Sequence, residues 1–183
     1  MSIVISNLKG VGKDVFIAEN VVIRRPHLAC MGSHVAIDFG FYCTTKIEIG
    51  DYVHIAPYVT VIGGENGLLK MGNFTNISVR GNIICGSDTF LGDGLITAPG
   101  IPHDLRDKLK IAPIIFEDFA NIGADVTILP GVTLAQGSVI GACSLVTKDT
   151  EPWTIYIGNP AKPFKMRKKE RIIENAKKLG YEL

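Results

Sequence analysis

Residues 122–146 read IGADVTILPGVTLAQGSVIGACSLV, and an aliphatic residue returns at every sixth position of this stretch. The repeating residues are Ile122, Ile128, Leu134, Ile140 and Val146. This period is neither that of a helix nor the simple alternation of a strand. A short, regular period is typical of a solenoid, in which each coil buries its apolar side against its neighbours.

The same period occurs earlier in the chain, in other phases. One set is Ile37, Cys43, Ile49, Ile55 and Val61, and another is Val11, Ile17 and Ile23. Two further series overlap, Met71-Ile77-Ile83 and Val79-Cys85-Leu91, and the sequence alone does not choose between them. The phase slips at residues 24–36 and 98–115, and extra residues in a solenoid leave the stack as loops. Residues 98–115 are therefore expected to protrude, in agreement with their three prolines and their glycine.

Composition fits a single domain over residues 1–183. The chain is 46% hydrophobic, and its net charge of +1 gives no argument for nucleic acid or a membrane as partner. No apolar run is long enough to span a membrane, and the first residues lack the apolar core of a signal peptide. We therefore expect a cytoplasmic protein with reduced cysteines, of which Cys43 and Cys85 occupy inward positions of the repeat.

The repeat ends at Val146. Residues 147–163 contain too much proline and glycine for a helix and are expected to be extended. The following residues, 164–180, have the apolar spacing of an amphipathic helix. Its first turns are crowded with lysine and arginine, which form either a solvated face or a cradle for a phosphate-rich ligand.

Most of the chain resembles the hexapeptide-repeat acyltransferases, and the resemblance is strongest from Asp88 to Arg167. The segment from Ile122 to Arg167 looks like their closing coils, and the stretch Tyr156-Ile-Gly-Asn-Pro-Ala-Lys162 is similar to the GNPAK ending of sugar acetyltransferases. The resemblance implies an all-β solenoid, the left-handed parallel β-helix. It also implies a homotrimer, acetyl-CoA as donor and an active site between two subunits. The identity of the sugar, and whether oxygen or nitrogen is acylated, stay open.

Acetyl transfer from a thioester requires a base for the proton of the acceptor, and histidine titrates in the suitable range. His103 lies in the expected loop, in PGIPHDLR, which is similar to the histidine-containing loop of galactoside acetyltransferases. His54 is the second candidate, because it precedes the inward Ile55 and so points outward. Each is also consistent with an ordinary exposed histidine. An amine acceptor offers a third course, in which positioning alone carries the reaction.

The donor-binding residues follow from the resemblance alone. Similar enzymes hold CoA along the last coils, where small residues allow a close approach. The matching positions are Gly123, Ala124, Gly141, Ala142, Asn159, Pro160, Ala161 and Lys162. Lys162, Lys165 and Arg167 are expected to meet the phosphates of CoA. The two glycines are equally consistent with plain corners, and Trp153 and Tyr156 are expected to pack against the coils rather than to stack on adenine.

The sequence therefore predicts an acetyl-CoA-dependent sugar acetyltransferase of surface-polysaccharide or nucleotide-sugar biosynthesis that uses no metal. A zinc hydratase resembling γ-class carbonic anhydrase is disfavoured, since the four histidines do not cluster as three ligands. A non-catalytic scaffold is the other alternative. The predicted trimer would cover outward aromatic residues. The candidates for this cover are Tyr52, Tyr58, Phe74, Phe90 and Phe119.

Overall fold

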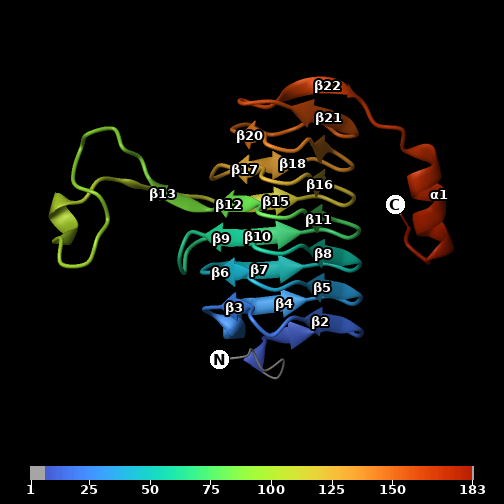
Figure 1. Ribbon diagram of the computed structural model, residues 1–183, viewed down its shortest axis with the longest axis horizontal. Coiled ribbons are helices and arrows are strands. Elements are labelled where there is room, and N and C mark those ends of the chain that lie inside the picture. The colour runs from blue at the N-terminus through green and yellow to red at the C-terminus, as the bar shows by residue number, and fades with distance from the viewer. Residues whose placement is uncertain (1–6, 183) are drawn as a thin grey trace.

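The computed structural model describes residues 7–182, and its main body is a three-sided parallel β-solenoid (Figure 1). Each coil supplies one short strand to each of three sheets, here named A, B and C. Sheet A contains β1 (Gly10–Val11), β4 (Ala29–Met31), β7 (Lys46–Ile49), β10 (Leu68–Met71), β15 (Ile114–Phe116) and β18 (Thr133–Leu134). Sheet C contains β3 (Val22–Ile23), β6 (Tyr42–Cys43), β9 (Thr60–Ile62), β12 (Asn82–Ile84), β17 (Thr127–Ile128) and β20 (Leu145–Val146).

Sheet B is longer because the chain doubles back at its C-terminal end. It contains β2 (Val15–Ile17), β5 (Val35–Ile37), β8 (Val53–Ile55), β11 (Asn76–Ile77), β16 (Asn121–Ile122), β19 (Val139–Ile140), β21 (Thr154–Ile157) and β22 (Lys162–Met166). All its pairings are parallel except the last, in which β22 runs antiparallel to β21. The terminal segment is therefore extended, as predicted, and it covers the last coil.

The six-residue period marks the core. Ile122, Ile128, Leu134, Ile140 and Val146 are all buried, and so are the members of the set from Ile37 to Val61. Of the two competing series the structure selects Met71-Ile77-Ile83, which is fully buried, whereas Leu91 is exposed. The inward thiols of Cys43 and Cys85 are also buried, and burial raises the pKa of Cys85 to about 12. These residues confirm a solenoid whose coils bury one aliphatic side chain per strand.

The protruding loop is longer than the sequence predicted. It begins at β13 (Gly86–Asp88) rather than at residue 98, and it returns through β14 (Leu109–Ile111), which pairs antiparallel with β13. We call residues 86–111 the arm. The prediction of its start was wrong because the sequence offered a competing six-residue series through Val79, Cys85 and Leu91. That series made residues 86–91 look like part of a coil. Residues 114–116 already belong to β15 in the next coil.

The C-terminal helix is shorter than predicted. α1 spans Glu170–Lys178. Of the residues expected to form its first turns, 164–166 belong to β22 and 167–169 connect β22 to α1. Four main-chain pairings between β21 and β22 hold that segment extended, and this outweighs its helical apolar spacing. Figure 1 shows α1 beside the solenoid on the side opposite the arm. In the part of the chain that the structure describes, no helix has the length and apolar character needed to cross a membrane.

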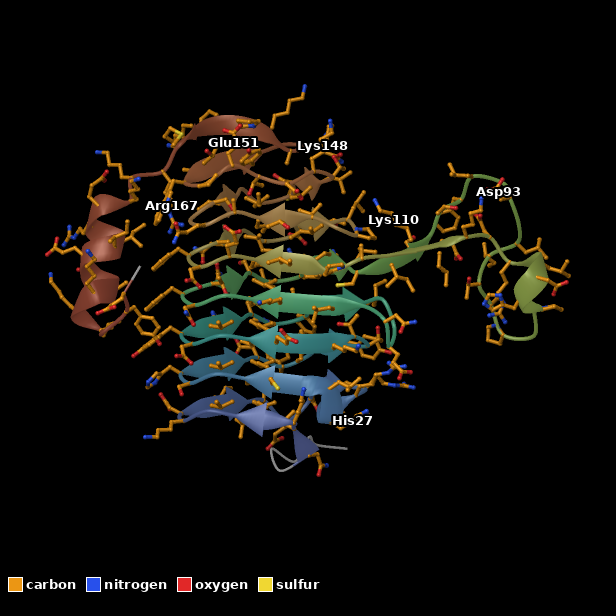
Figure 2. The ribbon with its side chains drawn as sticks, turned by 180° about the vertical axis from the view of Figure 1, so that it is seen from behind. His27, Asp93, Lys110, Lys148, Glu151 and Arg167 are labelled. Carbon is orange, nitrogen blue, oxygen red and sulfur yellow. The ribbon has the colours of Figure 1, made fainter. Side chains whose placement is uncertain are left out.

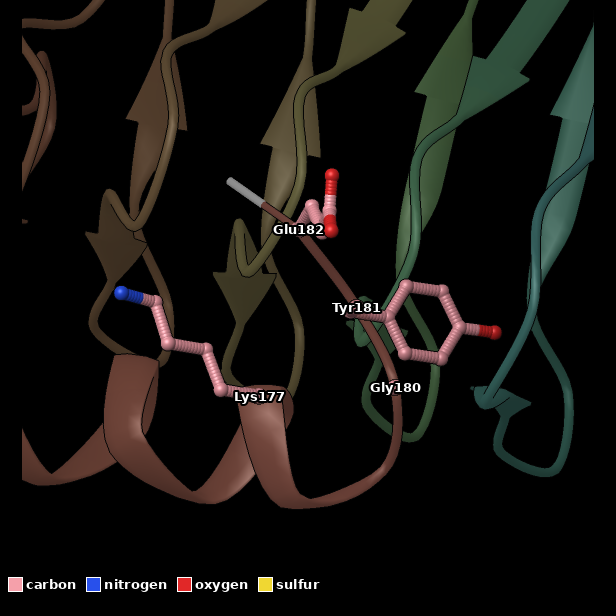
Figure 3. Close-up of a pocket in the computed structure, with 4 residues that line it drawn as sticks. All are labelled: Lys177, Gly180, Tyr181 and Glu182. Atoms are coloured by element: carbon pink, nitrogen blue, oxygen red, sulfur yellow. The ribbon is translucent and has the colours of Figure 1, made fainter.

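Bulky residues occupy the corner between sheets A and B, the A/B corner. His34, Tyr52, Phe74 and Phe119 all have positive φ there, and consecutive rings stack with centroids 4.5–5.1 Å apart. We call these four residues the aromatic ladder. Figure 3 shows Tyr181 just after α1, with its side chain turned toward the coils. Its ring packs edge-on against Tyr52 and Phe74. Tyr52, Phe74 and Phe119 are therefore covered by their own chain, which corrects the expectation that a partner subunit covers them.

Candidate active site

The corner between sheets B and C, the B/C corner, carries a line of mostly small residues that runs along the solenoid. Its members are Asp38, Ala56, Ser78, Gly123 and Gly141, which we call the corner column. Each follows the last residue of a sheet B strand and donates its backbone N–H to the strand end of the next coil, at 2.8–3.2 Å. Coils stack at roughly 4.8 Å, so one such residue lies above another at each step.

The C-terminal half of the corner column is lined by the four small residues predicted to lie along CoA. Gly123 and Gly141 are in the column, and Ala124 and Ala142 follow them. A Cβ on Gly123 would lie 2.7 Å from the Ala142 nitrogen, and one on Gly141 would lie 2.8 Å from an Ile157 methyl group. Close stacking of coils therefore accounts for both glycines. Together the four residues leave a strip without large side chains, along which an extended ligand fits.

The middle of the corner column carries Ser78, which is half-buried. Two residues after Ser78, Arg80 binds Asp125 of the following coil through two hydrogen bonds of 2.7 Å. These bonds lower the pKa of the Asp125 carboxyl group and keep it ionised beside the guanidinium. The pair compensates its own charge, and among the described residues no hydrogen bond engages the Ser78 hydroxyl.

The N-terminal half of the corner column carries an imidazole–carboxylate pair. His54 points outward from β8, as predicted, and its Nε2 lies 2.9 Å from Oδ2 of Asp38. An ionised Asp38 accepts a hydrogen bond from the Nε2–H group, which places the single proton of the neutral ring on Nε2 and leaves Nδ1 unprotonated. A histidine held in this way is equipped to accept a proton. His54 also pairs in register with Asn76, two residues before Ser78.

His103 lies elsewhere. It begins a short 3-10 turn, His103–Leu105, in the arm, and its side chain is exposed. The arm leaves the solenoid at the edge between sheets C and A, so sheet C separates it from the corner column of the same chain (Figure 1). The structure therefore does not bring His103 and His54 together within one chain.

The arm has an ordered base. The Asp88 carboxylate accepts hydrogen bonds from the hydroxyl and the backbone N–H of Thr97, at 2.7 and 3.3 Å. The buried Asp107 accepts hydrogen bonds from the Thr89 hydroxyl and the Lys108 N–H, at 3.0 and 2.7 Å. These contacts hold the two sides of the arm together at a fixed place beside sheet C.

The predicted residues of the terminal segment divide into two groups. Asn159 and Pro160 are exposed in the turn between β21 and β22, and Lys162 and Lys165 are exposed on β22. Ala161 packs against the core instead. The two lysines therefore remain open to an anionic ligand at the C-terminal end of the solenoid.

Arg167, which was predicted to meet a phosphate of CoA, makes contacts within its own chain. Its Nη1 donates hydrogen bonds to the carbonyl oxygens of Phe119 and Gly137, at 2.8 and 3.0 Å, and its guanidinium lies 5.9 Å from the Trp153 ring. Burial lowers the pKa of this guanidinium, which still stays charged at neutral pH. Figure 2 shows Arg167 on the side of the helix, and its hydrogen bonds attach the C-terminal segment to the solenoid.

The two aromatic residues near Arg167 pack against the coils, as predicted. Trp153 lies against Phe119 at 5.8 Å and fills the space above Gly137, where a Cβ would collide with the indole. The Tyr156 hydroxyl accepts a hydrogen bond from the Glu151 N–H, and its ring is buried in the core. Neither ring is open to adenine.

Asp38, Ser78 and Asp88 are candidate site residues that the sequence analysis did not single out. A signal for the first two existed, because Gly123 and Gly141 follow the inward Ile122 and Ile140 in the same way that Ser78 follows Ile77 and Asp38 follows Ile37. Choosing the correct series through Ile77 would have revealed Ser78 at an equivalent position. Asp88 carried no such signal, since it lies beyond the point where the repeat breaks. Within residues 7–182, no three metal-ligating side chains are grouped as a metal site requires.

The similarity of this chain to known proteins extends along the whole solenoid. The chain is 31% identical over 167 residues to dTDP-4-amino-4,6-dideoxy-D-glucose acyltransferase of Escherichia coli, which covers 90% of this chain and 85% of that protein. It is 29% identical over 124 residues to WbbJ of Escherichia coli K12, a putative lipopolysaccharide biosynthesis O-acetyl transferase, over 68% of this chain and 59% of that protein. No family model matches the chain.

One solved structure is similar along almost its full length. It is a serine variant of AntD, an N-acyltransferase from Bacillus cereus, in complex with dTDP-4-amino-4,6-dideoxyglucose and coenzyme A. The TM-score is 0.89 at 32% identity, and the match covers 96% of this chain and 92% of that one. The arm and the terminal segment therefore lie within a shared architecture.

Proposed function

The chain belongs to the sugar acyltransferases of the hexapeptide-repeat family, whose fold is the left-handed parallel β-helix, and we propose that it acylates the amino group of a dTDP-linked amino sugar. It is a CoA-dependent sugar acetyltransferase of nucleotide-sugar or polysaccharide biosynthesis. The observation that carries the choice of an amine is the similarity to the Escherichia coli acyltransferase, which extends through 90% of this chain. The O-acetyl transferase WbbJ matches less of both chains and supports a hydroxyl acceptor as second candidate.

The reaction follows from the corner column. The acceptor nitrogen attacks the thioester carbonyl, an N–C bond forms, the C–S bond breaks and CoA leaves as its thiol. The nitrogen must lose a proton, and His54, held by Asp38 at 2.9 Å, is the proposed acceptor of that proton. His103 is proposed to enter this site from a neighbouring subunit. Within its own chain it lies on the arm, away from the corner column.

Two further residues are proposed to contact the acceptor. Structures of AntD were solved for variants at one serine and at one aspartate, and the spacing between those two positions also separates Ser78 from Asp88 in this chain. Ser78 lies in the middle of the corner column, and Asp88 lies at the base of the arm. The two residues flank β12 from opposite ends, a placement that favours a site completed by a second subunit.

We therefore propose a homotrimer whose arms reach neighbouring subunits. The arm carries several large apolar side chains that its own chain leaves exposed, among them Leu91, Leu95, Ile96 and Leu105. Such residues are typical of surface that another subunit covers. Sedimentation velocity should give a trimer at micromolar protein, and a stable monomer would exclude this arrangement. The cytoplasm, where CoA thioesters occur, is the proposed compartment.

The donor is proposed to lie along the strip from Gly123 to Ala142. Its phosphates would meet Lys162 and Lys165, with the turn at Asn159 and Pro160 beside them. The thioester would then lie near Ser78, within reach of an acceptor bound further toward the N-terminus. This direction, from the lysines to Ser78, follows the corner column from its last coil to its middle.

The direct test compares two acceptors that differ in one atom. Purified protein is incubated with acetyl-CoA and either dTDP-4-amino-4,6-dideoxyglucose or its 4-hydroxy counterpart, and thiol release and product mass are followed. We expect thiol release and a gain of one acetyl group with the amino sugar and neither with the hydroxyl compound. Equal rates with the hydroxyl compound would establish an O-acetyltransferase instead, and no rate with either would exclude this acceptor class.

A further inference from the structure

Two aromatic side chains lie open at the N-terminal end of the corner column. Phe39 follows Asp38 and is 45% exposed, and Tyr58, from the next coil, is 55% exposed. Their rings meet edge to face, with centroids 4.9 Å apart and an interplanar angle of 77°. No side chain of the described residues covers the pair as α1 and Tyr181 cover the aromatic ladder.

The pair is held in place by its surroundings. The Tyr58 N–H donates a hydrogen bond of 3.1 Å to the Phe39 carbonyl, and the N–H of Arg80 donates one of 3.1 Å to Pro57. The Tyr58 ring lies across Gly40, where a Cβ would come within 2.6 Å of the ring. Gly40 also has a φ of 75°, which glycine adopts without strain. The sequence thus provides an aromatic surface that is formed before any ligand arrives.

The order of groups along the corner column indicates what this surface meets. In the proposed site the donor occupies the coils of Gly123 and Gly141, and the reacting nitrogen lies near Ser78. The rest of the acceptor must then extend away from the donor, toward the coils of Tyr58 and Phe39. These lie one and two coils below Ser78, roughly 5–10 Å along the axis. In a nucleotide sugar the part furthest from the reacting sugar carbon is the base.

We infer that Phe39 and Tyr58 form the platform on which the pyrimidine base of the nucleotide-sugar acceptor stacks. The inference rests on the proposed function, because it takes its direction from the donor strip and Ser78. A nucleobase offers a flat π-face to an aromatic ring, and such stacking depends little on hydrogen bonding. The platform therefore adds affinity for the nucleotide, while Ser78 and His54 act at the sugar.

The test uses thymidine diphosphate alone, with no sugar and no donor. Its dissociation constant is measured by calorimetry for the wild-type protein, Phe39→Ala, Tyr58→Ala and the ring-preserving Tyr58→Phe. We expect each alanine variant to bind about tenfold more weakly, as the loss of one stacking contact predicts. Tyr58→Phe should bind like wild type. Phe164→Ala, which removes an equally exposed ring from β22 at the other end of the solenoid, is the matched control and should also bind like wild type.

Three results would overturn the inference, and they are distinguishable. If wild type does not bind thymidine diphosphate, the proposed nucleotide acceptor fails together with the platform. If wild type binds and both alanine variants bind equally well, the acceptor class stands and the platform is wrong. If the alanine variants lose affinity and sedimentation shows that they have also dissociated into subunits, the rings are a contact between copies of the chain.

Discussion

The A/B corner and the B/C corner of this solenoid share one backbone geometry but differ in how their side chains are packed. Both use positive φ at bulky residues, with 57° at Tyr52 and Phe74 on one side and 60° and 56° at Tyr58 and Arg80 on the other. At the A/B corner the rings stack from coil to coil, and the C-terminal segment seals them. At the B/C corner the aromatic pair is followed by an ion pair and then by glycines, and no segment within residues 7–182 seals them.

The difference separates structure from function. A repeat that fills a corner with stacked rings stabilises the solenoid through contacts within its own chain. A repeat that interrupts the stacking leaves half-buried polar groups and a strip of small residues, where a ligand can replace the missing contacts. The active site is therefore expected where the repeat does not complete its own packing. The following predictions test that division, beginning with the largest expected effect.

Each corner carries one histidine–carboxylate pair, which provides a matched comparison. His54 lies 2.9 Å from Asp38 at the B/C corner, and His34 lies 3.0 Å from Asp14 at the A/B corner. His54→Asn should lower kcat by about 10²–10⁴-fold, because it removes a positioned base. His34→Asn should leave kcat near the wild-type value. Both are measured by thiol release at saturating acetyl-CoA.

Equal and small effects of the two substitutions would mean that positioning of an amine is sufficient and that no side-chain base is used. His103→Ala is measured in parallel, because the sequence placed the base there. If both His103→Ala and His54→Asn are inactive, mixing the two variants should restore part of the activity when the residues come from different subunits. Absence of any recovery in assembled mixed trimers would contradict a base supplied across the subunit boundary.

Arg167 should matter for stability and not for the donor. Arg167→Ala removes the hydrogen bonds to Phe119 and Gly137 and leaves two carbonyl oxygens without their partner. A hydrogen bond to a charged group contributes about 1.5–3 kcal/mol, so thermal unfolding should begin several degrees lower. The KM for acetyl-CoA should be unchanged. Arg171→Ala, an exposed arginine on α1, is the control and should unfold like wild type. A raised KM without a change in Tm would restore Arg167 as a phosphate contact.

Lys162 and Lys165 should show the converse behaviour. Reversing both charges should raise the KM for acetyl-CoA by about tenfold, since charge-assisted contacts to phosphate are lost. The effect should shrink as salt is added, because exposed charges are screened over about 10 Å at 0.1 M ionic strength. Lys177→Glu is the control, because Lys177 is an exposed lysine on α1, beside the A/B corner and away from the proposed donor strip. An equal rise in the KM for the acceptor would mean that β22 acts through folding.

The sequence predicted the solenoid because its physical signal is repeated. Each coil must place an aliphatic residue inward, so the period survives single exceptions such as Cys43. The boundaries of the arm and of α1 were wrong because they depend on contacts made once. The pairing of β13 with β14 and that of β22 with β21 each override a local pattern. Propensity alone contains no term for such contacts.

The site was predicted unevenly for the same reason. The direction of His54 follows from strand alternation, and the structure has it outward. The partner of His54 is Asp38, sixteen residues earlier, and no local rule connects the two. The contacts of Arg167 within the chain were not foreseen, because its cation looked free in sequence, whereas folding places it against carbonyls from two other coils. A charged residue can be assigned to a ligand only once its contacts within the chain are known.

The smallest expected effect concerns the seal of the A/B corner. The Tyr181 hydroxyl donates a hydrogen bond of 2.6 Å to Asp51. This bond, followed by the one from the Ser33 N–H, lowers the pKa of Asp51. A depressed pKa means that Asp51 stabilises the fold above the usual aspartate pKa and loses this contribution as the pH falls through its lower folded value. Tyr181→Phe should therefore lower the free energy of unfolding by about 0.5–1.5 kcal/mol at pH 7, measured in urea.

The difference between wild type and Tyr181→Phe should narrow as the pH falls below the ordinary aspartate pKa of about 3.9. There Asp51 takes up a proton in the unfolded chain before it does so in the folded protein, where its pKa is lower. Tyr58→Phe is the control at the B/C corner, because the Tyr58 hydroxyl makes no hydrogen bond within residues 7–182. It should unfold like wild type at every pH. If both substitutions were neutral, the Tyr181 hydroxyl would contribute nothing, and ring packing alone would hold the C-terminal segment on the ladder. If both were equally destabilising, the two corners would not differ in the way that the open site requires.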